Sequence, residues 1–336
     1  MWHIGPQNRL VRSIVCVVWA GAMLACSHMQ FLARRPPPGR DFLIIGHRGA
    51  PNLACENTLK SFAEAVRFGA NALELDLSMT QDAQLVLWHD WGPSLEGELR
   101  PSGVCRLLHP LLPSPIHTIS LAEFQRDYGY EQEGQRVPAA LFEAFVQRFA
   151  HDSRVRWFFL DLKIPEDRPD LVSPLFHNAL QTLRRYKAIA KAVFSTPYQS
   201  IFYPLFDEAQ RWQQETGTRV EIAQDVEGPQ LLQLSNWTSA VRRNQGAEAR
   251  FALWGKPVIT LQSARDFLLN ELQRRDAANA TRPPQARMHF IVWTVNDASD
   301  LCDLVGLGVD GIITDEPDRL QAVVQSLRQH GTCRLS

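Results

Sequence analysis

The chain has 336 residues, of which 45% are hydrophobic and 21% are charged, and its formal net charge is -1. This composition is typical of a globular protein and argues against intrinsic disorder. Because so small a net charge gives no strong overall field to hold a polyanion, we expect no nucleic-acid partner.

The first 26 residues have the pattern of an export signal. Arg9 and Arg12 precede an apolar run over residues 13–25, which ends in Ala25-Cys26-Ser27. A basic start, an apolar segment of about 7–15 residues and small residues at its end are typical of secretory signals. Because Met23-Leu24-Ala25-Cys26 is similar to a bacterial lipobox, we expect a periplasmic or extracellular protein with a membrane tether through an acylated Cys26. Plain signal cleavage and a short membrane anchor are the alternatives.

Residues 27–40 follow as a linker, since the run Pro36-Pro37-Pro38-Gly39 makes a stiff spacer. Beyond the signal and Cys26, four cysteines remain: Cys55, Cys105, Cys302 and Cys333. An even number permits disulfides in an oxidising compartment, although sequence spacing does not fix their pairing.

From residue 41 onward, short apolar runs alternate with amphipathic ones. Helical spacing is clearest at 56–68 and 171–186. The runs expected to be strands are 42–46, 72–79, 84–88, 157–162, 190–194, 219–223, 251–254, 290–295 and 311–313.

Strands that alternate with helices favour parallel pairing with right-handed crossovers. About eight such units predict an α/β protein with a (β/α)8 TIM barrel, which we place at residues 41–330. An open doubly wound sheet is the alternative fold. Residues 90–136 are rich in Pro, Gly and polar side chains, so we expect a small inserted lobe after the second barrel strand region.

The residues whose side chains could take part in catalysis or bind a metal lie at predicted strand ends. His47 and Arg48 directly follow the first strand, and His89 ends a later one. Glu74 and Asp76 lie two apart in a strand, so both side chains face the same side. Paired carboxylates flanked by leucines are costly to bury without a cation, and hard divalent ions prefer such oxygen ligands. Together these residues supply an acid, a base, a phosphate clamp and a metal site.

Each of these features also has a purely structural interpretation. Glu74 and Asp76 could form an ion pair with Arg48, and Glu56-Asn57-Thr58 could be a helix N-terminus. Thr314-Asp315, just before Pro317, is predicted to cap a helix rather than to act in catalysis.

The sequence resembles the glycerophosphodiester phosphodiesterase family, within the phospholipase-C-like phosphodiesterases, over nearly all of residues 43–320. The motifs that carry the likeness are His47-Arg48-Gly49, Glu56-Asn57-Thr58, Glu74-Leu75-Asp76, His89-Asp90, Asp161-Leu162-Lys163, Val292-Trp293-Thr294 and Gly311-Ile312-Ile313-Thr314-Asp315.

The resemblance implies a TIM barrel, one divalent ion, often Ca²⁺ or Mg²⁺, and hydrolysis of a small-molecule glycerophosphodiester to glycerol 3-phosphate and an alcohol. By matching position, the metal ligands would be Glu74 and Asp76, joined by Asp161 where the family usually has the longer Glu. The acid–base pair would be His47 and His89. Arg48 and Lys163 would contact phosphate, and Trp293 would line the glycerol pocket unless it is plain core. Ala83 stands where the family usually has Gly.

Two other functions compete with this one. A lysophospholipase D would act on lysophospholipids, which keep one acyl chain, and would need an apolar groove, with Leu107, Leu108, Leu111 and Leu112 as candidates. A catalytically inactive barrel could serve as a surface binding protein, but the retained charged residues argue against it.

Overall fold

The computed structural model describes residues 41–89, 104–226, 238–256 and 261–333. The predicted signal segment 1–26 with Cys26, the linker 27–40 and the first part of the predicted lobe, 90–103, lie outside the described residues. Export and lipidation therefore stay predictions.

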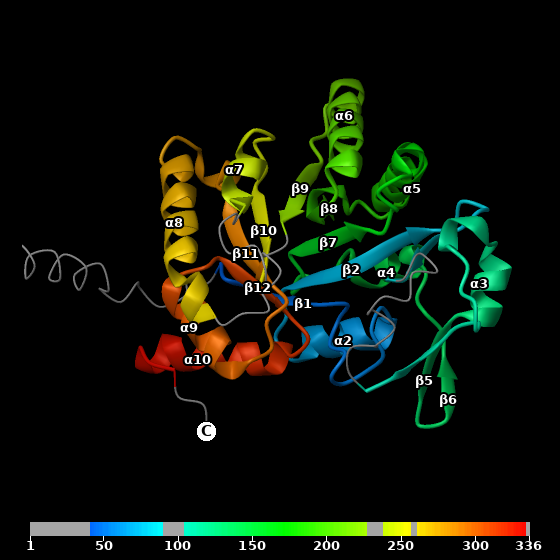
Figure 1. Ribbon diagram of the computed structural model, residues 1–336, viewed down its shortest axis with the longest axis horizontal. Coiled ribbons are helices and arrows are strands. Elements are labelled where there is room, and N and C mark those ends of the chain that lie inside the picture. The colour runs from blue at the N-terminus through cyan, green and yellow to red at the C-terminus, as the bar shows by residue number, and fades with distance from the viewer. Residues whose placement is uncertain (1–40, 90–103, 227–237, 257–260, 334–336) are drawn as a thin grey trace, which may run out of the picture. The chain divides into compact units, whose positions relative to one another are not determined.

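Eight parallel strands form a closed barrel (Figure 1). Their order is β1-β12-β11-β10-β9-β8-β7-β2, and pairing of β1 with β2 closes the ring. The predicted TIM barrel is thereby confirmed, and the open sheet is excluded. The barrel strands are β1 (Leu43–Gly46), β2 (Ala72–Met79), β7 (Trp157–Leu162), β8 (Ala192–Thr196), β9 (Glu221–Val226), β10 (Phe251–Gly255), β11 (His289–Trp293) and β12 (Gly311–Thr314).

Amphipathic helices cover the outside of the barrel. Helix α2 shows the pattern: the side chain of Thr58 caps its N-terminus, while Phe62 and Val66 are buried against the strands. The helices are α2 (Leu59–Arg67), α4 (Phe142–Phe149), α5 (Val172–Arg185), α6 (Gln199–Thr216), α7 (Ala240–Gln245), α8 (Leu261–Asn279), α9 (Ala298–Leu307) and α10 (Pro317–His330). Among the described residues no helix is both long and apolar enough to cross a membrane.

Strand alternation decides which side chains enter the barrel. A compact apolar cluster fills the interior, made of Leu43, Ile45, Ala72, Phe159, Val193, Ala223, Phe251, Leu253, Ile291 and Ile313. Two residues further along a strand, the side chain faces inward again. The next inward positions toward the C-terminal ends are His47, Glu74, Asp161, Ser195, Asp225, Gly255, Trp293 and Asp315. The barrel therefore has an apolar interior and, at the C-terminal ends of its strands, a ring of mostly polar residues. We call this end of the barrel the mouth.

Some predicted strand boundaries are wrong. Residues 84–88 form no barrel strand: β3 (Leu85–Leu87) pairs antiparallel with β2 as a hairpin. The strand expected at 219–223 begins at Glu221 and runs to Val226, and the one expected at 190–194 begins only after a short 3-10 turn at Ile189–Lys191. An apolar run marks burial, whereas the paired segment depends on neighbouring strands, so the two need not coincide.

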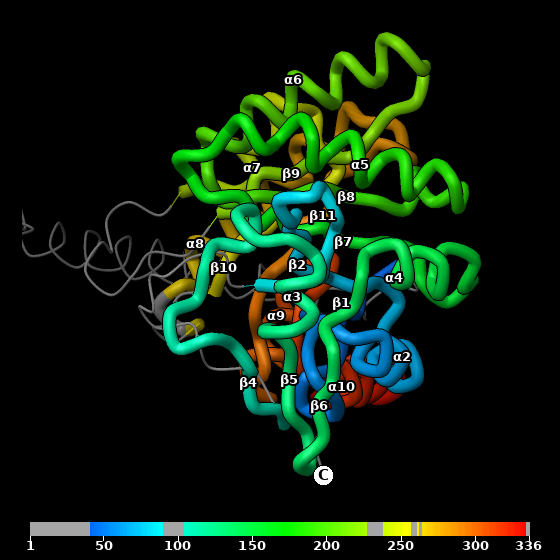
Figure 2. The backbone as a smooth tube through the Cα atoms, turned by 90° about the vertical axis from the view of Figure 1, so that its right-hand side faces the viewer, coloured from blue at the N-terminus to red at the C-terminus, as the bar shows by residue number. Residues whose placement is uncertain are grey.

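The inserted lobe is a three-stranded antiparallel sheet beside the barrel, seen at the right of Figure 1 and facing the viewer in Figure 2. Its elements are β4 (Arg106–Leu108), the 3-10 turn η1 (Ile116–Thr118), α3 (Leu121–Asp127), β5 (Gly129–Gln132) and β6 (Gln135–Val137). Trp88 packs against Phe124, Tyr128 and Tyr130 in a core of its own.

Two disulfides join the four remaining cysteines. Cys55–Cys105 links the loop before α2 to the lobe, and Cys302–Cys333 links α9 to the segment after α10. The sequence permitted disulfides but did not give this pairing.

Candidate active site

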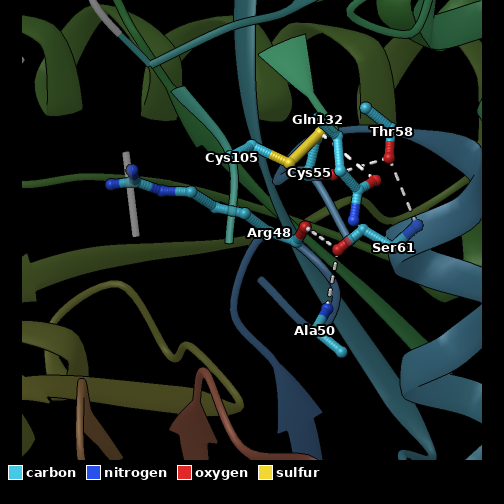
Figure 3. Close-up of a disulfide and its surroundings, with 7 residues drawn as sticks. All are labelled: Arg48, Ala50, Cys55, Thr58, Ser61, Cys105 and Gln132. Atoms are coloured by element: carbon cyan, nitrogen blue, oxygen red, sulfur yellow. Dashed lines mark hydrogen bonds between the residues drawn. A yellow bond between two sulfur atoms is a disulfide. The ribbon is translucent and has the colours of Figure 1, made fainter. Parts of the chain in front are cut away.

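The loop after β1 carries the first site residues in a constrained backbone. His47 donates its backbone N–H to Thr314 at 2.9 Å. Arg48 has a left-handed φ of 51°, and its backbone N–H donates to Oε2 of Glu74 at 2.8 Å. Figure 3 shows the support behind it: the Ser61 hydroxyl donates to the carbonyl of Arg48 and accepts the N–H of Ala50. A non-glycine residue at positive φ is unfavourable by itself, so these bonds hold the loop in place.

Glu74, Asp76 and Asp161 form the cluster that the sequence predicted for a metal. Asp76 and Asp161 are register partners on β2 and β7. One oxygen from each of the three carboxylates lies within 4.8 Å of the others. Burial, followed by the neighbouring Asp76 carboxylate, raises the pKa of Glu74 to about 7. Oδ1 of Asp161 is buried and accepts no hydrogen bond from the described residues. Crowded carboxylates with an orphaned oxygen fit a hard divalent ion such as Ca²⁺ or Mg²⁺.

Two basic side chains lie against the same carboxylates. Nζ of Lys163 is 2.7 Å from Oδ2 of Asp161 and 3.2 Å from Oδ1 of Asp76. Nε of Arg48 is 2.9 Å from Oδ2 of Asp76 without the alignment of a hydrogen bond. Burial alone would raise the pKa of Asp76, but Arg48 and Lys163 hold it below its usual range. Of the ion pair considered as an alternative, the part between Arg48 and Asp76 is therefore present alongside the carboxylate cluster, whereas Glu74 accepts the backbone N–H of Arg48.

Asn57 has a role that the helix-terminus interpretation did not include. Its Nδ2 donates to Oδ2 of Asp76 at 2.7 Å, and its Oδ1 accepts the backbone N–H of Asp76 at 3.3 Å. Thr58, the next residue, is the N-cap of α2 as expected. Asn57 thus fixes the orientation of one cluster carboxylate.

His47 belongs to a hydrogen-bonded chain that crosses from β1 to β12. Its Nδ1 lies 2.6 Å from Oδ1 of Asp315. Oδ2 of Asp315 accepts from Nδ2 of Asn296 at 2.5 Å, and the backbone N–H of Asp315 donates to Oδ1 of Asn296 at 2.9 Å. Burial lowers the pKa of His47, but the charge and hydrogen bond of Asp315, together with the charge of Glu74, raise it, and the net pKa is raised. The other ring nitrogen, Nε2, is 4.0 Å from Glu74 and faces the carboxylate cluster.

His89 follows the β2–β3 hairpin and lies in the electrostatic range of the same groups. Burial lowers its pKa well below the usual value, and the positive charges of Arg48 and Lys163 lower it further. The two imidazoles therefore differ in the direction of their net pKa shift, because Asp315 acts on His47 whereas burial, Arg48 and Lys163 outweigh Asp76 at His89.

Trp293 lies at the rim of the apolar interior, partly exposed, and its Nε1 donates to Oδ1 of Asp225 at 2.6 Å. The interpretation of Trp293 as plain core is therefore incomplete, because the ring is anchored by a polar partner in the mouth.

Asp315, Asn296 and Asp225 were missed by sequence reasoning. Thr314-Asp315 does not cap α10: its N-cap is Glu316, which makes no side-chain capping bond within the described part of the chain. Pro317 does occupy the first turn as predicted. The inward alternation of β9 and β12, extended beyond Ala223 and Ile313, would have pointed to Asp225 and Asp315.

The four leucines suggested for an acyl-chain groove do not line one surface together. Leu107 is buried in the core of the lobe, whereas Leu111 and Leu112 are 96% and 86% exposed.

The chain is similar to known proteins in sequence and in fold. The model of the glycerophosphoryl diester phosphodiesterase family matches residues 47–319. A glycerophosphodiester phosphodiesterase from Caldanaerobacter subterraneus is 44% identical over 289 residues, which cover 84% of this chain and 98% of the relative. One from Bacillus subtilis is 22% identical over 84% of this chain and 86% of the relative.

Solved structures share the fold. A glycerophosphodiester phosphodiesterase from Parabacteroides distasonis superposes with a TM-score of 0.59 at 18% identity, over 85% of this chain and 97% of that one. A phosphodiesterase from Oleispira antarctica, solved with the product sn-glycerol-3-phosphate, gives a TM-score of 0.54 at 18% identity, over 84% and 96% of the two chains.

Proposed function

The chain belongs to the glycerophosphoryl diester phosphodiesterase family, and we propose that its barrel mouth hydrolyses glycerophosphodiesters to glycerol 3-phosphate and an alcohol. One observation supports this most strongly: the carboxylate cluster of Glu74, Asp76 and Asp161 lies beside His47, whose Nε2 faces Glu74 at 4.0 Å. A cation site next to an imidazole is the arrangement that phosphodiester cleavage needs.

Charge explains why these residues suit the reaction. A phosphodiester is an anion that repels nucleophiles, and its oxygens gain negative charge in the transition state. Arg48 and Lys163 supply fixed positive charges at the cluster, and such preorganised charge is worth more in a buried site than in water. A divalent ion held by Glu74, Asp76 and Asp161 would supply further charge stabilisation.

The two histidines differ in the form that each favours. The lowered pKa of His89 favours a neutral imidazole, which can accept a proton from the substrate's own glycerol hydroxyl as that oxygen bonds to phosphorus and the alcohol leaves. Water opens the resulting cyclic phosphate in a second step and gives glycerol 3-phosphate. Asp315 favours the protonated form of His47, which can donate a proton from Nε2 to the leaving alcohol. We therefore assign His89 as the general base and His47 as the general acid of the first step.

A substrate screen with added Ca²⁺ or Mg²⁺ tests this function directly. We expect release of alcohol from glycerophosphodiesters such as glycerophosphocholine, and loss of this activity in a chelator. His47→Ala and His89→Ala should each lower kcat by about 10²–10⁴-fold, the usual contribution of one proton transfer, with unchanged circular dichroism. Near wild-type turnover in either folded variant would contradict the assignment.

A lysophospholipase D activity is the second candidate, because part of the chain is similar to such an enzyme. Human lysophospholipase D is 36% identical over 107 residues, which is 30% of this chain and 32% of that protein. Choline release from glycerophosphocholine and from lysophosphatidylcholine, measured side by side, separates the two activities.

A further inference from the structure

Asp225 is a buried acid in the barrel mouth that the proposed reaction does not use. It lies at the C-terminal end of β9, two residues beyond the inward-facing Ala223. In the closed ring of eight strands, β9 is four strands from β1 in either direction. Asp225 therefore lies on the wall opposite His47.

The inward neighbours of Asp225 have small side chains. The adjacent strands β8 and β10 contribute Ser195 and Gly255 at their mouth positions. A hydroxymethyl group and a single hydrogen fill less volume than any other pair of inward side chains in the mouth. Larger side chains at these two positions would leave less space for a substrate group beside the carboxylate.

The hydrogen bonds of Asp225 use only one of its two oxygens. Oδ1 accepts both Nε1 of Trp293 at 2.6 Å and the backbone N–H of Val226 at 2.8 Å. Oδ2 accepts no hydrogen bond from any described residue, and it is not among the fully buried oxygens that lack a partner, although the residue is only 8% exposed. Oδ2 is therefore the acceptor that Asp225 keeps available to a bound molecule, and a ligand that covers it without donating to it would leave it unpaired at a cost in free energy.

We propose that Asp225, together with the indole it anchors, selects substrates with a free glycerol over lysophospholipids, because Oδ2 accepts a hydrogen bond from the terminal glycerol hydroxyl. This inference rests on the proposed function and names the substrate class within it. The flat face of Trp293 would pack against the glycerol carbons, while the carboxyl group of Asp225 forms a hydrogen bond with the terminal glycerol hydroxyl.

A lysophospholipid carries an ester and an acyl chain where glycerol has this hydroxyl. The ester has no donor for Oδ2, and the chain would cover a polar group that is left unpaired. A site built to bond a substrate hydroxyl rejects analogues that lack it.

A cationic head group is the other moiety that a carboxyl group could hold. Burial, followed by the nearby Asp161 carboxylate, raises the pKa of Asp225 well above its usual value. A hydroxyl can donate to Oδ2 of the carboxylate or accept from it when the group is protonated, whereas a quaternary ammonium has no hydrogen-bonding group and gains only from a full negative charge.

The test compares choline release from glycerophosphocholine with release from a monomeric short-chain 1-acyl lysophosphatidylcholine. The variants are Asp225→Leu, which keeps the side-chain shape without polar atoms, and Asp225→Asn, whose oxygen stays with the two donors at the Oδ1 position while its NH₂ can donate to the glycerol hydroxyl from the Oδ2 position. Trp293→Phe keeps an aromatic ring but removes the bond to Asp225.

We expect Asp225→Leu to lower kcat/KM for glycerophosphocholine by about 10–150-fold, the worth of one hydrogen bond to a charged or strongly polar group. Activity on the lysolipid should stay level or rise, so the selectivity ratio falls by at least about tenfold. Asp225→Asn should retain most selectivity, and Trp293→Phe should raise KM more than it lowers kcat. In titration calorimetry, Asp225→Leu should weaken binding of sn-glycerol 3-phosphate but not of 1-deoxyglycerol 3-phosphate.

An equal loss on both substrates, or an unchanged ratio in Asp225→Leu, overturns the assignment. A change in preference between choline and uncharged head groups at constant glycerol selectivity also overturns it. If the wild-type protein with added metal turns over neither substrate, it is the proposed function that has failed.

Discussion

Replacing Asp315 by Asn tests how the site controls His47. Nδ2 of Asn296 donates to Oδ2 of Asp315, and Oδ1 of Asp315 faces Nδ1 of His47 at 2.6 Å. In the variant, either the Oδ1 or the Oδ2 position of residue 315 is taken by an amide NH₂ group. If the oxygen keeps its bond to Asn296, the NH₂ faces His47, donates to Nδ1 and moves the imidazole proton to Nε2. If the amide flips, its NH₂ meets the donor of Asn296. The first arrangement replaces the charged bond between Asp315 and protonated His47 by a neutral one, and the second loses the bond to Asn296.

The expected decrease of kcat in Asp315→Asn can be estimated from the hydrogen bond between Asp315 and His47. A hydrogen bond to a charged group is worth about 1.5–3 kcal/mol, which corresponds to about 10–150-fold in rate. The ceiling is about 10⁴-fold, the largest usual contribution of a general acid. We therefore expect kcat for glycerophosphocholine to fall by at least about tenfold while KM changes little.

The assay uses two leaving groups. Choline needs protonation as it leaves, whereas p-nitrophenolate does not, so a general-acid defect should largely disappear on the p-nitrophenyl ester of glycerol 3-phosphate. ¹⁵N spectra of the His47 ring should report the changed tautomer. In Asp315→Asn/Asn296→Ala the amide is free to turn its oxygen toward His47, so part of kcat should return. The same loss on both esters would refute the assignment of His47 as acid, and an unchanged tautomer would refute the positioning role of Asp315.

Two further predictions concern the cluster and the backbone. Because burial and the neighbouring Asp76 raise the pKa of Glu74 to about 7, protons compete with the metal below that pH. Calorimetry from pH 5.5 to 8 should show Ca²⁺ or Mg²⁺ affinity rising about tenfold per pH unit below 7 and staying constant above it. Glu74→Gln should remove most of the metal binding and its dependence on pH. A metal affinity of the wild-type protein that does not change with pH would contradict the role of Glu74 as a metal ligand. Ala83 is exposed and has a left-handed φ of 59°. It stands at the position where the glycerophosphodiester phosphodiesterase family usually has Gly. Ala83→Gly should raise the free energy of unfolding by about 1 kcal/mol, whereas the control Ala277→Gly, in the exposed face of α8, should lower it by about 1 kcal/mol; urea denaturation measures both, and destabilisation by Ala83→Gly would show that the turn is not strained.

The sequence was most informative where function follows from local spacing. Glu74 and Asp76 share a face because side chains alternate along one strand, and His47 lies in the mouth because it directly follows a buried strand. Both facts need only a few neighbouring residues. Repeated strand and helix patterns likewise favoured a barrel over an open sheet, but only the pairing of β1 with β2 shows that it closes.

What could not be predicted depends on contacts distant along the chain. His47 and Asp315 are 268 residues apart, and Asp225 and Trp293 are 68 apart. Residues 84–88 have the composition of a barrel strand, but only the partner β2 determines that they form an antiparallel hairpin. The Pro and Gly content of the lobe marked a break in the barrel without revealing its sheet or its aromatic core.

The Cys55–Cys105 disulfide makes the loop between β1 and α2 sensitive to the redox conditions around the protein. It closes a stretch of 50 residues and clamps the segment just ahead of Asn57. Under reducing conditions the chain-entropy model assigns a loss of about 4 kcal/mol to opening such a stretch. A copy produced in a reducing cytosol would thus keep every residue of the candidate site and yet hold the side-chain amide of Asn57 less firmly, so we expect full activity only when this disulfide has formed.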